Sequence, residues 1–367
     1  MKKNIGKIEL FSLTLLFIIG NTGLYALGVD IAKQDAWISI LLAMLLSYIL
    51  LWIYLKLQSY FPNDNLALMI IKSVEKPIAY TLVIFYSIYF FYIALLNFSM
   101  FVEFIRFYLL PQTSKLTISV LLLINIFYIN SLGIEVIARL AGLMAPLFIL
   151  FVIIIYSLIF SSGIVNFQNL QPFLGNGITA VVDAAIPELL IFPFADMVLL
   201  LMIWEYVKIK KSISQISFLA MTLGGVIITF ALIIIIGVLG VNWATIANVA
   251  NMAVSQLINI GYLKNIDVII VIVLFLLGFF KMIPFLFGSI SLVNSLLNLH
   301  NNIWVNTIFS IFLLIFNYAP FTGVEFYSWI NSFDRRTERI MEYIHISFQM
   351  LIPTFLLIIT WLKRIRK

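Results

Sequence analysis

Two short segments of the chain combine helix-breaking residues with polar side chains inside long apolar stretches. They are Gly20-Asn21-Thr22-Gly23 and Phe192-Pro193-Phe194-Ala195-Asp196. Glycine weakens a helix by about 1 kcal/mol relative to alanine, and proline removes a backbone donor. An unpaired amide or carbonyl costs several kcal/mol in hydrocarbon, so a broken helix persists in a membrane only where protein, water or a ligand satisfies it. These two segments are therefore candidate binding sites for a small molecule.

The chemistry expected at the two breaks is recognition of a molecule with one negative and one positive end. With the N-terminus inside, the outer half of the first helix begins near Gly23, and its free amides favour an anion such as a carboxylate. The outer half of the sixth helix ends near Phe192, and its free carbonyls favour a cation. An amino acid zwitterion matches both ends. Side chains of the breaks and of the middle of the third helix complete the predicted ligand-binding set, which is Gly20, Asn21, Thr22, Gly23, Tyr92, Asn97, Phe192, Pro193, Phe194 and Asp196.

Two charged residues, Asp196 and Lys281, lie inside apolar stretches. Asp196 either pairs with the ammonium group of a ligand or caps the inner half of the sixth helix, and we expect the cap. Lys281 lies about 15 residues, or about 22 Å, from either end of the stretch 266–297, which is too deep for its side chain to reach the interface. A charge at that depth is functional by default, so we expect Lys281 to face protein or water. Alternatively, two shorter elements meet near Met282–Pro284 and leave Lys281 at an interface.

The elements that position these residues are transmembrane helices. Of the 367 residues, 63% are hydrophobic and 10% are charged, against roughly 45–50% and about 25% in soluble domains. This composition excludes a soluble globule and a disordered chain. Ten continuous apolar stretches are long enough to span a membrane as helices. They cover approximately residues 8–28, 36–56, 78–106, 116–133, 140–162, 182–206, 217–240, 266–297, 303–319 and 343–362.

The arrangement of the ten stretches predicts a single transmembrane domain built from two repeats of five helices. Repeat one covers about residues 8–162 and repeat two about residues 182–362. Each break falls in the first helix of its repeat, which is the pattern expected of inverted repeats with a central binding site. The alternative is that these are ordinary glycines and prolines, which are common in membrane helices.

The distribution of charge predicts orientation and excludes several classes of function. If the N-terminus is cytoplasmic, the inner segments contain 14 Lys and Arg and the outer segments contain 7, which favours both termini inside. The net charge of +6 then reflects orientation rather than a nucleic-acid partner. The chain has no cysteine, and His300 and His345 are far apart. We therefore expect no metal site, no cofactor and no enzymatic activity.

Three segments are characteristic when taken together. They are Ala32–Ser39 (AKQDAWIS), Asn169–Gly175 (NLQPFLG) and Phe192–Asp196. Ten helices with breaks in the first and sixth resemble the amino acid–polyamine–organocation superfamily and its LeuT-like 5+5 inverted repeat. Within it, the chain resembles the spore permease family, the B subunit of spore germinant receptors. The resemblance covers essentially the whole chain. Many relatives have a proline after the first break, where this chain has Tyr25-Ala26-Leu27, so the shape of the outer half of that helix is open.

The resemblance implies an endospore-forming bacterium, the inner spore membrane, and a complex with a larger A subunit and a lipoprotein C subunit. It also implies that the chain senses a small nutrient such as an amino acid or nucleoside. In this fold the eighth helix lines a cation site against the first, so the ammonium of Lys281 would replace a bound sodium ion. A germinant sensor, a proton-coupled amino acid permease, and a water or ion conduit in a larger complex share this fold, which does not choose among them.

Overall fold

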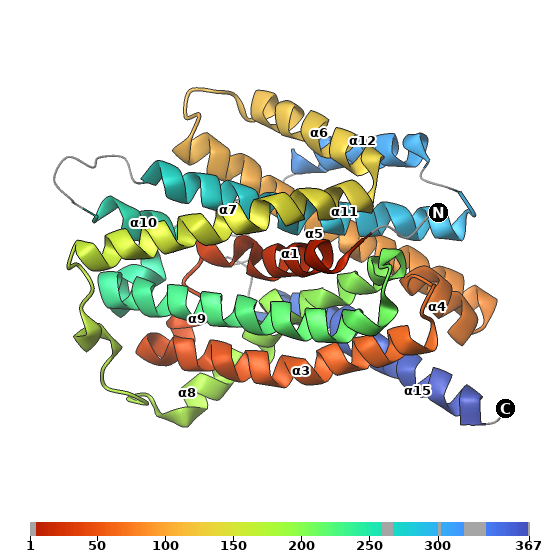
Figure 1. Cartoon of the computed structure of the whole chain (residues 1–367), viewed down its shortest axis with the longest axis horizontal. Coiled ribbons are helices and arrows are strands. Elements are labelled where there is room, and N and C mark those ends of the chain that lie inside the picture. Colours follow the sequence, from red (N-terminus) through yellow and green to blue (C-terminus); the bar gives the residue numbers. More distant parts are fainter. Residues whose placement is uncertain (1–4, 248, 259–266, 300–301, 319–334, 366–367) are drawn as a thin grey trace.

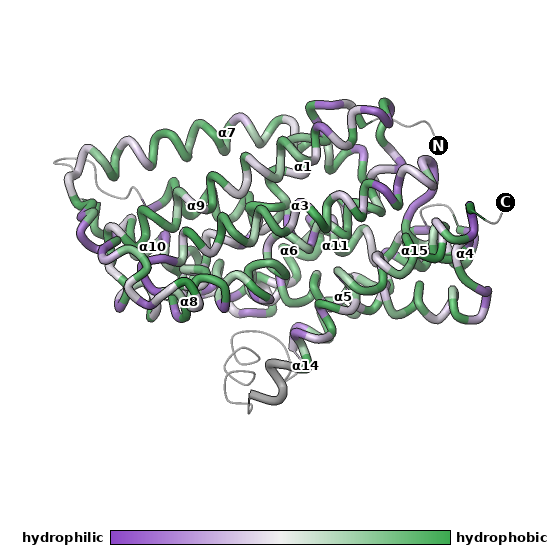
Figure 2. Tube along the Cα trace, turned by 90° about the horizontal axis from the view of Figure 1, so that it is seen from below, coloured by the Kyte–Doolittle hydropathy of each residue, from purple (hydrophilic) through white to green (hydrophobic). Residues whose placement is uncertain are grey.

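The computed structural model describes residues 5–247, 249–258, 267–299, 302–318 and 335–365, with side chains of the last segment described from residue 340. Within these residues the chain is a bundle of long helices (Figure 1). Nine helical segments are long and apolar enough to cross a membrane, and Ile303–Asn317 is a tenth, shorter apolar helix. Hydrophobic residues run along the helices, and hydrophilic residues gather toward the ends of the bundle (Figure 2). The predicted all-α membrane fold is confirmed.

The helices of the first half are α1 (Lys7–Ile19), α2 (Val29–Ala32), α3 (Ala36–Tyr60), α4 (Leu66–Ser73), α5 (Lys76–Tyr108), α6 (Lys115–Leu132) and α7 (Ile134–Ser161). The helices of the second half are α8 (Gly177–Ala184), α9 (Ile213–Ile246), α10 (Ala250–Gln256), α11 (Asp267–Leu296), α12 (Ile303–Asn317), α14 (Arg335–Ile346) and α15 (Ile352–Ile365). A segment of 3-10 helix, η1 (Gly20–Leu24), follows α1. Continuing from α8 are the π-helical segment η4 (Ala185–Phe194) and the 3-10 segment η5 (Ala195–Met202), and η8 (Ser347–Leu351) joins α14 to α15.

Helix α1 lies at the centre of the bundle, where it packs against α7, α9 and α11 (Figure 1). Small residues let these helices approach closely. A Cβ at Gly224 of α9 would lie 3.1 Å from Ile18 of α1, and one at Gly278 of α11 would lie 2.7 Å from Phe101 of α5. Membrane helices associate mainly through such close packing, because lipid offers no hydrophobic driving force between them. The central position of α1 places its broken end deep inside the protein.

One end of the bundle, which we name the α4 end, contains the start of α1 and the end of α15. The Ile5 amide donates to the carbonyl of Tyr206 at 3.2 Å. Asn65, which caps α4, donates to the Glu205 carboxylate at 3.0 Å. The Arg364 guanidinium in α15 donates to the carbonyl of Tyr60 at 2.8 Å. The two ends of the described chain therefore lie on the same side of the bundle.

The opposite end, the α8 end, joins the two segments on which the family resemblance depends. The Gln34 side chain donates to the carbonyl of Pro172 at 2.7 Å, and the amide of Leu174 donates to the Asp35 carboxylate at 3.0 Å. Their aromatic neighbours Trp37 and Phe173 meet edge to face with ring centroids 6.3 Å apart. These two segments therefore bind each other and fasten the connection between the two halves onto the start of α3.

Candidate functional site

The first helix is broken at the predicted place, but it does not resume as a helix at Gly23. After α1 ends, Gly20 adopts φ 33° and ψ −123°, a conformation that favours glycine. Residues Gly20–Leu24 form the 3-10 segment η1, and Tyr25 is extended. Between η1 and α3 the only α-helix is the four-residue α2, which is followed by a short 3-10 turn. The expected helix N-terminus near Gly23, with amides aimed at an anion, is therefore wrong.

Side chains of the protein satisfy part of the backbone of this first break. The Thr22 hydroxyl donates to the carbonyl of Ile19 at 2.5 Å. The Asn251 side chain, from α10, donates to the carbonyl of Gly23 at 2.8 Å. Because these carbonyls already accept hydrogen bonds, the backbone of the first break offers a guest less than the sequence indicated. Recognition has to come mainly from side chains.

The sixth helix is interrupted at two places. Phe192 has φ −123° and ψ 122°, which confirms the predicted break, and Ile186 has φ −128° and ψ 123°. The π-helical segment η4 contains both residues, and the 3-10 segment η5 continues directly from it with Ala195. A proline follows each interruption, as expected because proline disfavours helical geometry in the residue before it.

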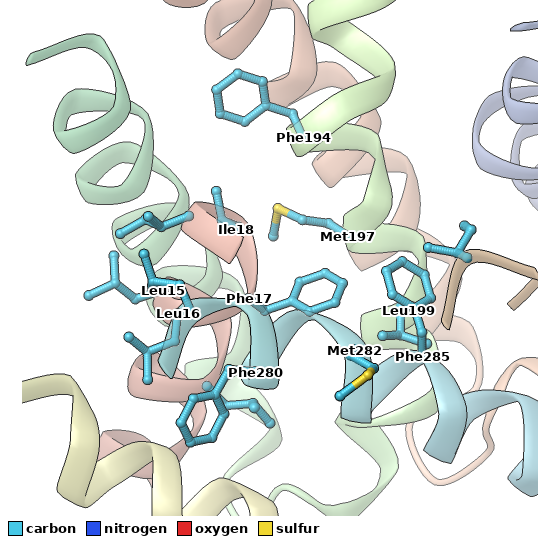
Figure 3. Close-up of a cluster of buried hydrophobic side chains, with 14 of the residues drawn as sticks. Leu15, Leu16, Phe17, Ile18, Phe194, Met197, Leu199, Phe280, Met282 and Phe285 are labelled. Atoms are coloured by element: carbon cyan, nitrogen blue, oxygen red, sulfur yellow. The ribbon is translucent and has the colours of Figure 1, made fainter. Parts of the chain in front are cut away.

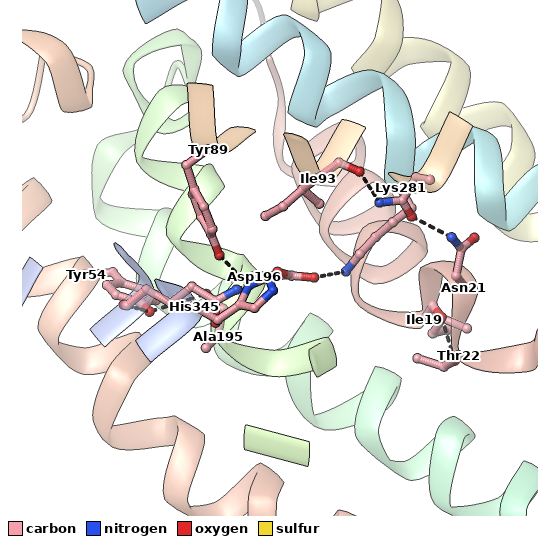
Figure 4. Close-up of polar contacts among 12 residues, drawn as sticks. Ile19, Asn21, Thr22, Tyr54, Tyr89, Ile93, Ala195, Asp196, Lys281 and His345 are labelled. Atoms are coloured by element: carbon pink, nitrogen blue, oxygen red, sulfur yellow. Dashed lines mark hydrogen bonds and ion pairs between the residues drawn. The ribbon is translucent and has the colours of Figure 1, made fainter. Parts of the chain in front are cut away.

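An ion pair between Asp196 and Lys281 lies beside both breaks (Figure 4). The Lys281 ammonium nitrogen is 2.7 Å from Asp196 Oδ2. Gln349 donates to the other carboxylate oxygen at 2.7 Å. The expected capping role of Asp196 is wrong, since η5 has no side-chain cap. Asp196 instead pairs with the ammonium of Lys281, because α11 passes beside the break.

Lys281 is buried, as its depth in the sequence predicted, and α11 is continuous through it. This excludes the alternative of two shorter elements meeting near Met282. The ammonium also lies 4.4 Å from the ring centre of Phe17 and 5.0 Å from that of Phe192. Aromatic faces attract a cation, and more strongly once it has lost its water. A Cβ at Gly20 would lie 2.6 Å from Lys281 Cδ, so the first break makes room for the lysine stem.

The carboxylate of Asp196 is also connected to helices that contain neither break. Gln349 lies in η8, and its carbonyl accepts a hydrogen bond from the Tyr54 hydroxyl of α3 at 2.5 Å. The Tyr89 hydroxyl of α5 lies 2.8 Å from Nδ1 of His345 in α14 (Figure 4). Neither Gln349 nor His345 was predicted as a site residue, although both are polar residues within the tenth apolar stretch. Their polarity within an apolar stretch was the signal in the sequence that could have identified them.

A cavity of about 550 Å³, which we name the break cavity, adjoins both breaks and extends toward the α8 end. Such a volume is within the range of small-molecule sites. Five predicted residues line it, namely Asn21, Asn97, Phe192, Asp196 and Lys281. Its other polar and charged lining residues, which the sequence analysis did not assign, are Tyr25, Asp30, Glu188, Thr245 and His345.

Asn21 and Asn97 join the two walls of the break cavity. The Asn21 side chain donates to Asn97 Oδ1, and Asn97 donates to the carbonyl of Ile93 at 2.7 Å. Both side chains are buried in the protein and line the cavity. They supply neutral hydrogen-bonding groups close to the ion pair.

The other predicted ligand-binding residues do not line the break cavity. Thr22 and Gly23 line a separate apolar cavity of about 70 Å³. The Tyr92 hydroxyl lies 3.9 Å from the sulfur of Met341. Phe194 belongs to the buried hydrophobic cluster shown in Figure 3. Gly20 and Pro193 complete the set outside the lining.

The break cavity can bind a small polar molecule, and its residues carry no visible catalytic machinery. The ion pair presents one positive and one negative group side by side, which matches the two ends of a zwitterion. Among the described residues, no group of three or more His, Cys, Asp or Glu is placed to hold a metal ion.

Comparisons with known proteins agree with this membrane architecture. A family model described as "Spore germination protein" matches residues 4–322. Spore germination protein KB of Bacillus subtilis (strain 168) is 27% identical over 100% of this chain and 97% of that protein. Spore germination protein XB of Bacillus anthracis is 23% identical over 60% of this chain and 62% of that protein.

A solved structure shares the fold. A mutant of the manganese transporter of Eremococcus coleocola matches with a TM-score of 0.53 and 14% identity, covering 97% of this chain and 76% of that chain. At this identity the likeness concerns the fold alone. The chain has a LeuT-like membrane fold.

Proposed function

The chain belongs to the family of spore germination proteins, a transporter-like and non-enzymatic family, and we propose that it is the nutrient-sensing membrane subunit of a germination receptor. In this proposal a small molecule such as an amino acid binds in the break cavity. Binding shifts a conformational equilibrium that a partner subunit detects. A ligand shifts such an equilibrium only by its different affinity for the two states.

The observation that carries the proposal is the buried Lys281–Asp196 pair beside the break cavity. The carboxylate of an amino acid can approach the ammonium, while its own ammonium can approach Asp196. Helix α1, which contains Phe17, ends at Ile19. The sixth helix is interrupted at Phe192, and the segment that contains Asp196 begins at Ala195. A guest that competes for the pair would therefore act on the relative position of the first, sixth and eighth helices.

The remaining predicted site residues have indirect roles in this proposal. Lys281 would act as the cation-site surrogate, with its ammonium in place of a sodium ion against the first helix. Gly20 makes room for its stem. Thr22, Gly23, Pro193 and Phe194 would shape the two breaks. Tyr92, on the third helix, would support the wall that contains Asn97.

We further propose the partners and location that the family implies. The relatives named KB and XB support a B-type subunit within a receptor complex, which would contain a larger A subunit and a lipoprotein C subunit. The inner spore membrane would be its location. The excess of Lys and Arg in segments at the α4 end supports cytoplasmic termini, and the break cavity then opens to the outer side.

The proposal is tested with two neighbouring substitutions in the first break. Asn21→Leu removes an amide that lines the break cavity, and Thr22→Val changes the next residue, which faces the other cavity. Spores with Asn21→Leu should need a higher nutrient concentration for half-maximal germination, measured as loss of optical density. Spores with Thr22→Val should be affected less, because the hydroxyl donates to the carbonyl of Ile19 and does not line the break cavity. An equal response in all three, at equal abundance in the membrane, would contradict binding in this cavity.

A proton-coupled amino acid permease is the second candidate function. The LeuT-like fold and a second large cavity at the α4 end support it. The discriminating measurement is counterflow of labelled amino acid in liposomes that contain this chain alone. Exchange that Asn21→Leu abolishes would favour the permease, and binding without exchange would favour the sensor.

A further inference from the structure

A second cavity, of about 540 Å³, lies at the α4 end, and we name it the Glu205 cavity. It is lined by Asn65 before α4, by the junction of α6 and α7, by Glu205 and Tyr206, and by the last turns of α11. Buried side chains that include Phe17, Leu199 and Phe285 occupy the interior of the bundle near the ion pair (Figure 3). The two cavities share no lining residue, so the Glu205 cavity is distinct from the site discussed above.

One charged group that lines this cavity is the carboxylate of Glu205, which lies between the spans Gly177–Met202 and Lys210–Ile246. Asn65 donates to it at 3.0 Å, and the same amide group lies 3.0 Å from the Ser295 hydroxyl. Burial raises the pKa of Glu205, and the hydrogen bond from Asn65 opposes that increase. Among the described residues, no Lys or Arg nitrogen forms an ion pair with this carboxylate. Its hydrogen-bonding neighbours, Asn65 and Tyr206, are neutral, and the Lys210 ammonium, which donates to the carbonyls of Trp204 and Glu205, acts on it as a nearby charge.

An acceptor without a donor, the side-chain oxygen of Asn294, lines the same cavity. Asn294 is 6% exposed, and its side-chain oxygen accepts no hydrogen bond from the described residues. A buried amide oxygen without a donor costs about 1–3 kcal/mol. Ser291 and Ser295 line the cavity from the same face of α11, since residues three and four apart lie on one side of a helix. The lining is therefore rich in acceptors that converge from two elements.

The chemistry of this lining matches a cation that carries N–H groups. A carboxylate, an amide oxygen and two hydroxyls can accept several hydrogen bonds from one ammonium. A bare metal ion fits less well, because among the described residues no three His, Cys, Asp or Glu are grouped to hold one. Arg139 also lines the cavity but is exposed to solvent, and Glu135 accompanies it. Among the described residues that line the cavity, the charged side chains are therefore two carboxylates, Glu135 and Glu205, and one guanidinium, Arg139.

We propose that the Glu205 cavity is a second binding site, which takes a small primary ammonium compound. Glu205 supplies the counter-charge and Asn294 supplies a neutral acceptor. The site lies at the opposite end of the bundle from the break cavity and does not depend on germinant binding there. Under the orientation proposed above, it samples solutes of the cytoplasmic side.

The test measures binding of radiolabelled methylammonium to the purified full chain in detergent micelles. Tetramethylammonium is the competing control, because it has the same charge and no N–H group. We expect unlabelled methylammonium to displace the label and tetramethylammonium to fail. Equal displacement by both would overturn the proposal, since the acceptors would then have no role.

Four substitutions locate the site. Glu205→Gln should weaken methylammonium binding about tenfold or more, which corresponds to about 1.4 kcal/mol. Asp64→Asn is the matched control, because this carboxylate is adjacent to Asn65, pairs with Lys72 and does not line the cavity. The Asp64 carboxylate acts on Glu205 only as a nearby charge, so binding to this variant should fall far less than binding to Glu205→Gln. Asn294→Leu should weaken binding severalfold, and it tests the site independently if Glu205→Gln fails to fold. Parental binding in both Glu205→Gln and Asn294→Leu, or loss of binding only in Glu188→Gln of the break cavity, would overturn the proposal.

Discussion

The break cavity and the Glu205 cavity are built from the same two helical segments but hold their carboxylates in different ways. The sixth helix supplies Asp196 to the first cavity, and the turn that follows it supplies Glu205 to the second. Helix α11 supplies Lys281 to the first and Asn294 to the second. Asp196 is paired with a buried ammonium, whereas Glu205 is held by a neutral amide. One pair of elements thus holds one carboxylate with a cation and another with a neutral donor.

The difference shows that the depth of a charged side chain in the bundle determines which kind of partner stabilises it. A fully buried ion is expensive, and a partner of opposite charge with further hydrogen bonds offsets that cost. Lys281 and Asp196 lie within spans and form such a pair, completed by Gln349 and the ring of Phe17. Glu205 lies between spans, where burial is incomplete and neutral donors suffice. Substitutions in the two cavities should therefore differ in their effects on stability.

The largest effect is expected from Lys281→Met. It leaves the carboxylate of Asp196 buried without its cation, and breaking a buried pair in this way costs about 3–5 kcal/mol. The midpoint of thermal unfolding of the detergent-solubilised chain should fall strongly. Glu205→Gln in the other cavity should change that midpoint far less, because it leaves no buried charge behind.

The double variant Lys281→Met with Asp196→Asn is the control for this prediction. Removing both charges eliminates the unpaired ion, so most of the lost stability should return. A single variant as stable as the parent would mean that the pair does not determine the stability of the break cavity. No recovery in the double variant would indicate that the packing of the lysine stem, rather than its charge, is what matters.

The two helix breaks and the burial of Lys281 were predictable from the sequence, because their signals are local. The run Gly20-Asn21-Thr22-Gly23 and Pro193 placed both breaks correctly, since glycine and proline act on their own backbone. The burial of Lys281 followed from its distance to the ends of an apolar stretch. Signals of this kind need no knowledge of neighbours.

The partners of these residues were not predictable, because they depend on packing between distant segments. Asp196 was expected to cap a helix, and it pairs with Lys281 of α11. The backbone near Gly23 was expected to offer free amides to an anion, and instead Asn251 of α10 donates to the carbonyl of Gly23. Residues Gly20, Thr22 and Phe194 belong to the breaks yet do not line the cavity, because the turn of the backbone directs each side chain separately.

The next effect in size concerns two glycines, one beside each site. Gly20 and Gly133 both have positive φ, of 33° and 87°, so alanine strains the backbone at each by about 1–3 kcal/mol. A Cβ at Gly20 would also lie 2.6 Å from Lys281, whereas one at Gly133 meets nothing within 4 Å. Gly20→Ala should therefore lower the unfolding midpoint more than Gly133→Ala does. Equal losses would show that the lysine stem moves aside freely.

A smaller effect is expected on ligand affinity from Asn97→Ala. This residue lines the break cavity with an amide, so the nutrient that triggers germination should bind about tenfold more weakly, or about 1.4 kcal/mol. Tyr92→Phe, on the same helix, changes a hydroxyl that faces Met341 rather than the cavity, and should leave affinity unchanged. Isothermal titration of the purified chain measures both. Weaker binding in Tyr92→Phe alone would move the ligand away from the ion pair.

The smallest effect is a change in the pH dependence of stability that Glu205 produces. Because burial raises its pKa above the ordinary value of 4.5, the folded chain keeps this proton at pH values where the unfolded chain has lost it. The resulting stabilisation is complete below the unfolded pKa and is lost as the pH rises through the folded pKa. Compared with Glu205→Gln, the parent should therefore lose stability as the pH increases above about 4.5. Asn65→Ala removes a donor that lowers the pKa of Glu205, so the loss of stability should occur at higher pH. This variant should also have a lower unfolding midpoint at every pH, because it loses the side-chain cap of α4. Thermal unfolding midpoints across a pH series measure all three, and parallel curves for the parent and Glu205→Gln would show that this carboxylate is held as easily as one in water.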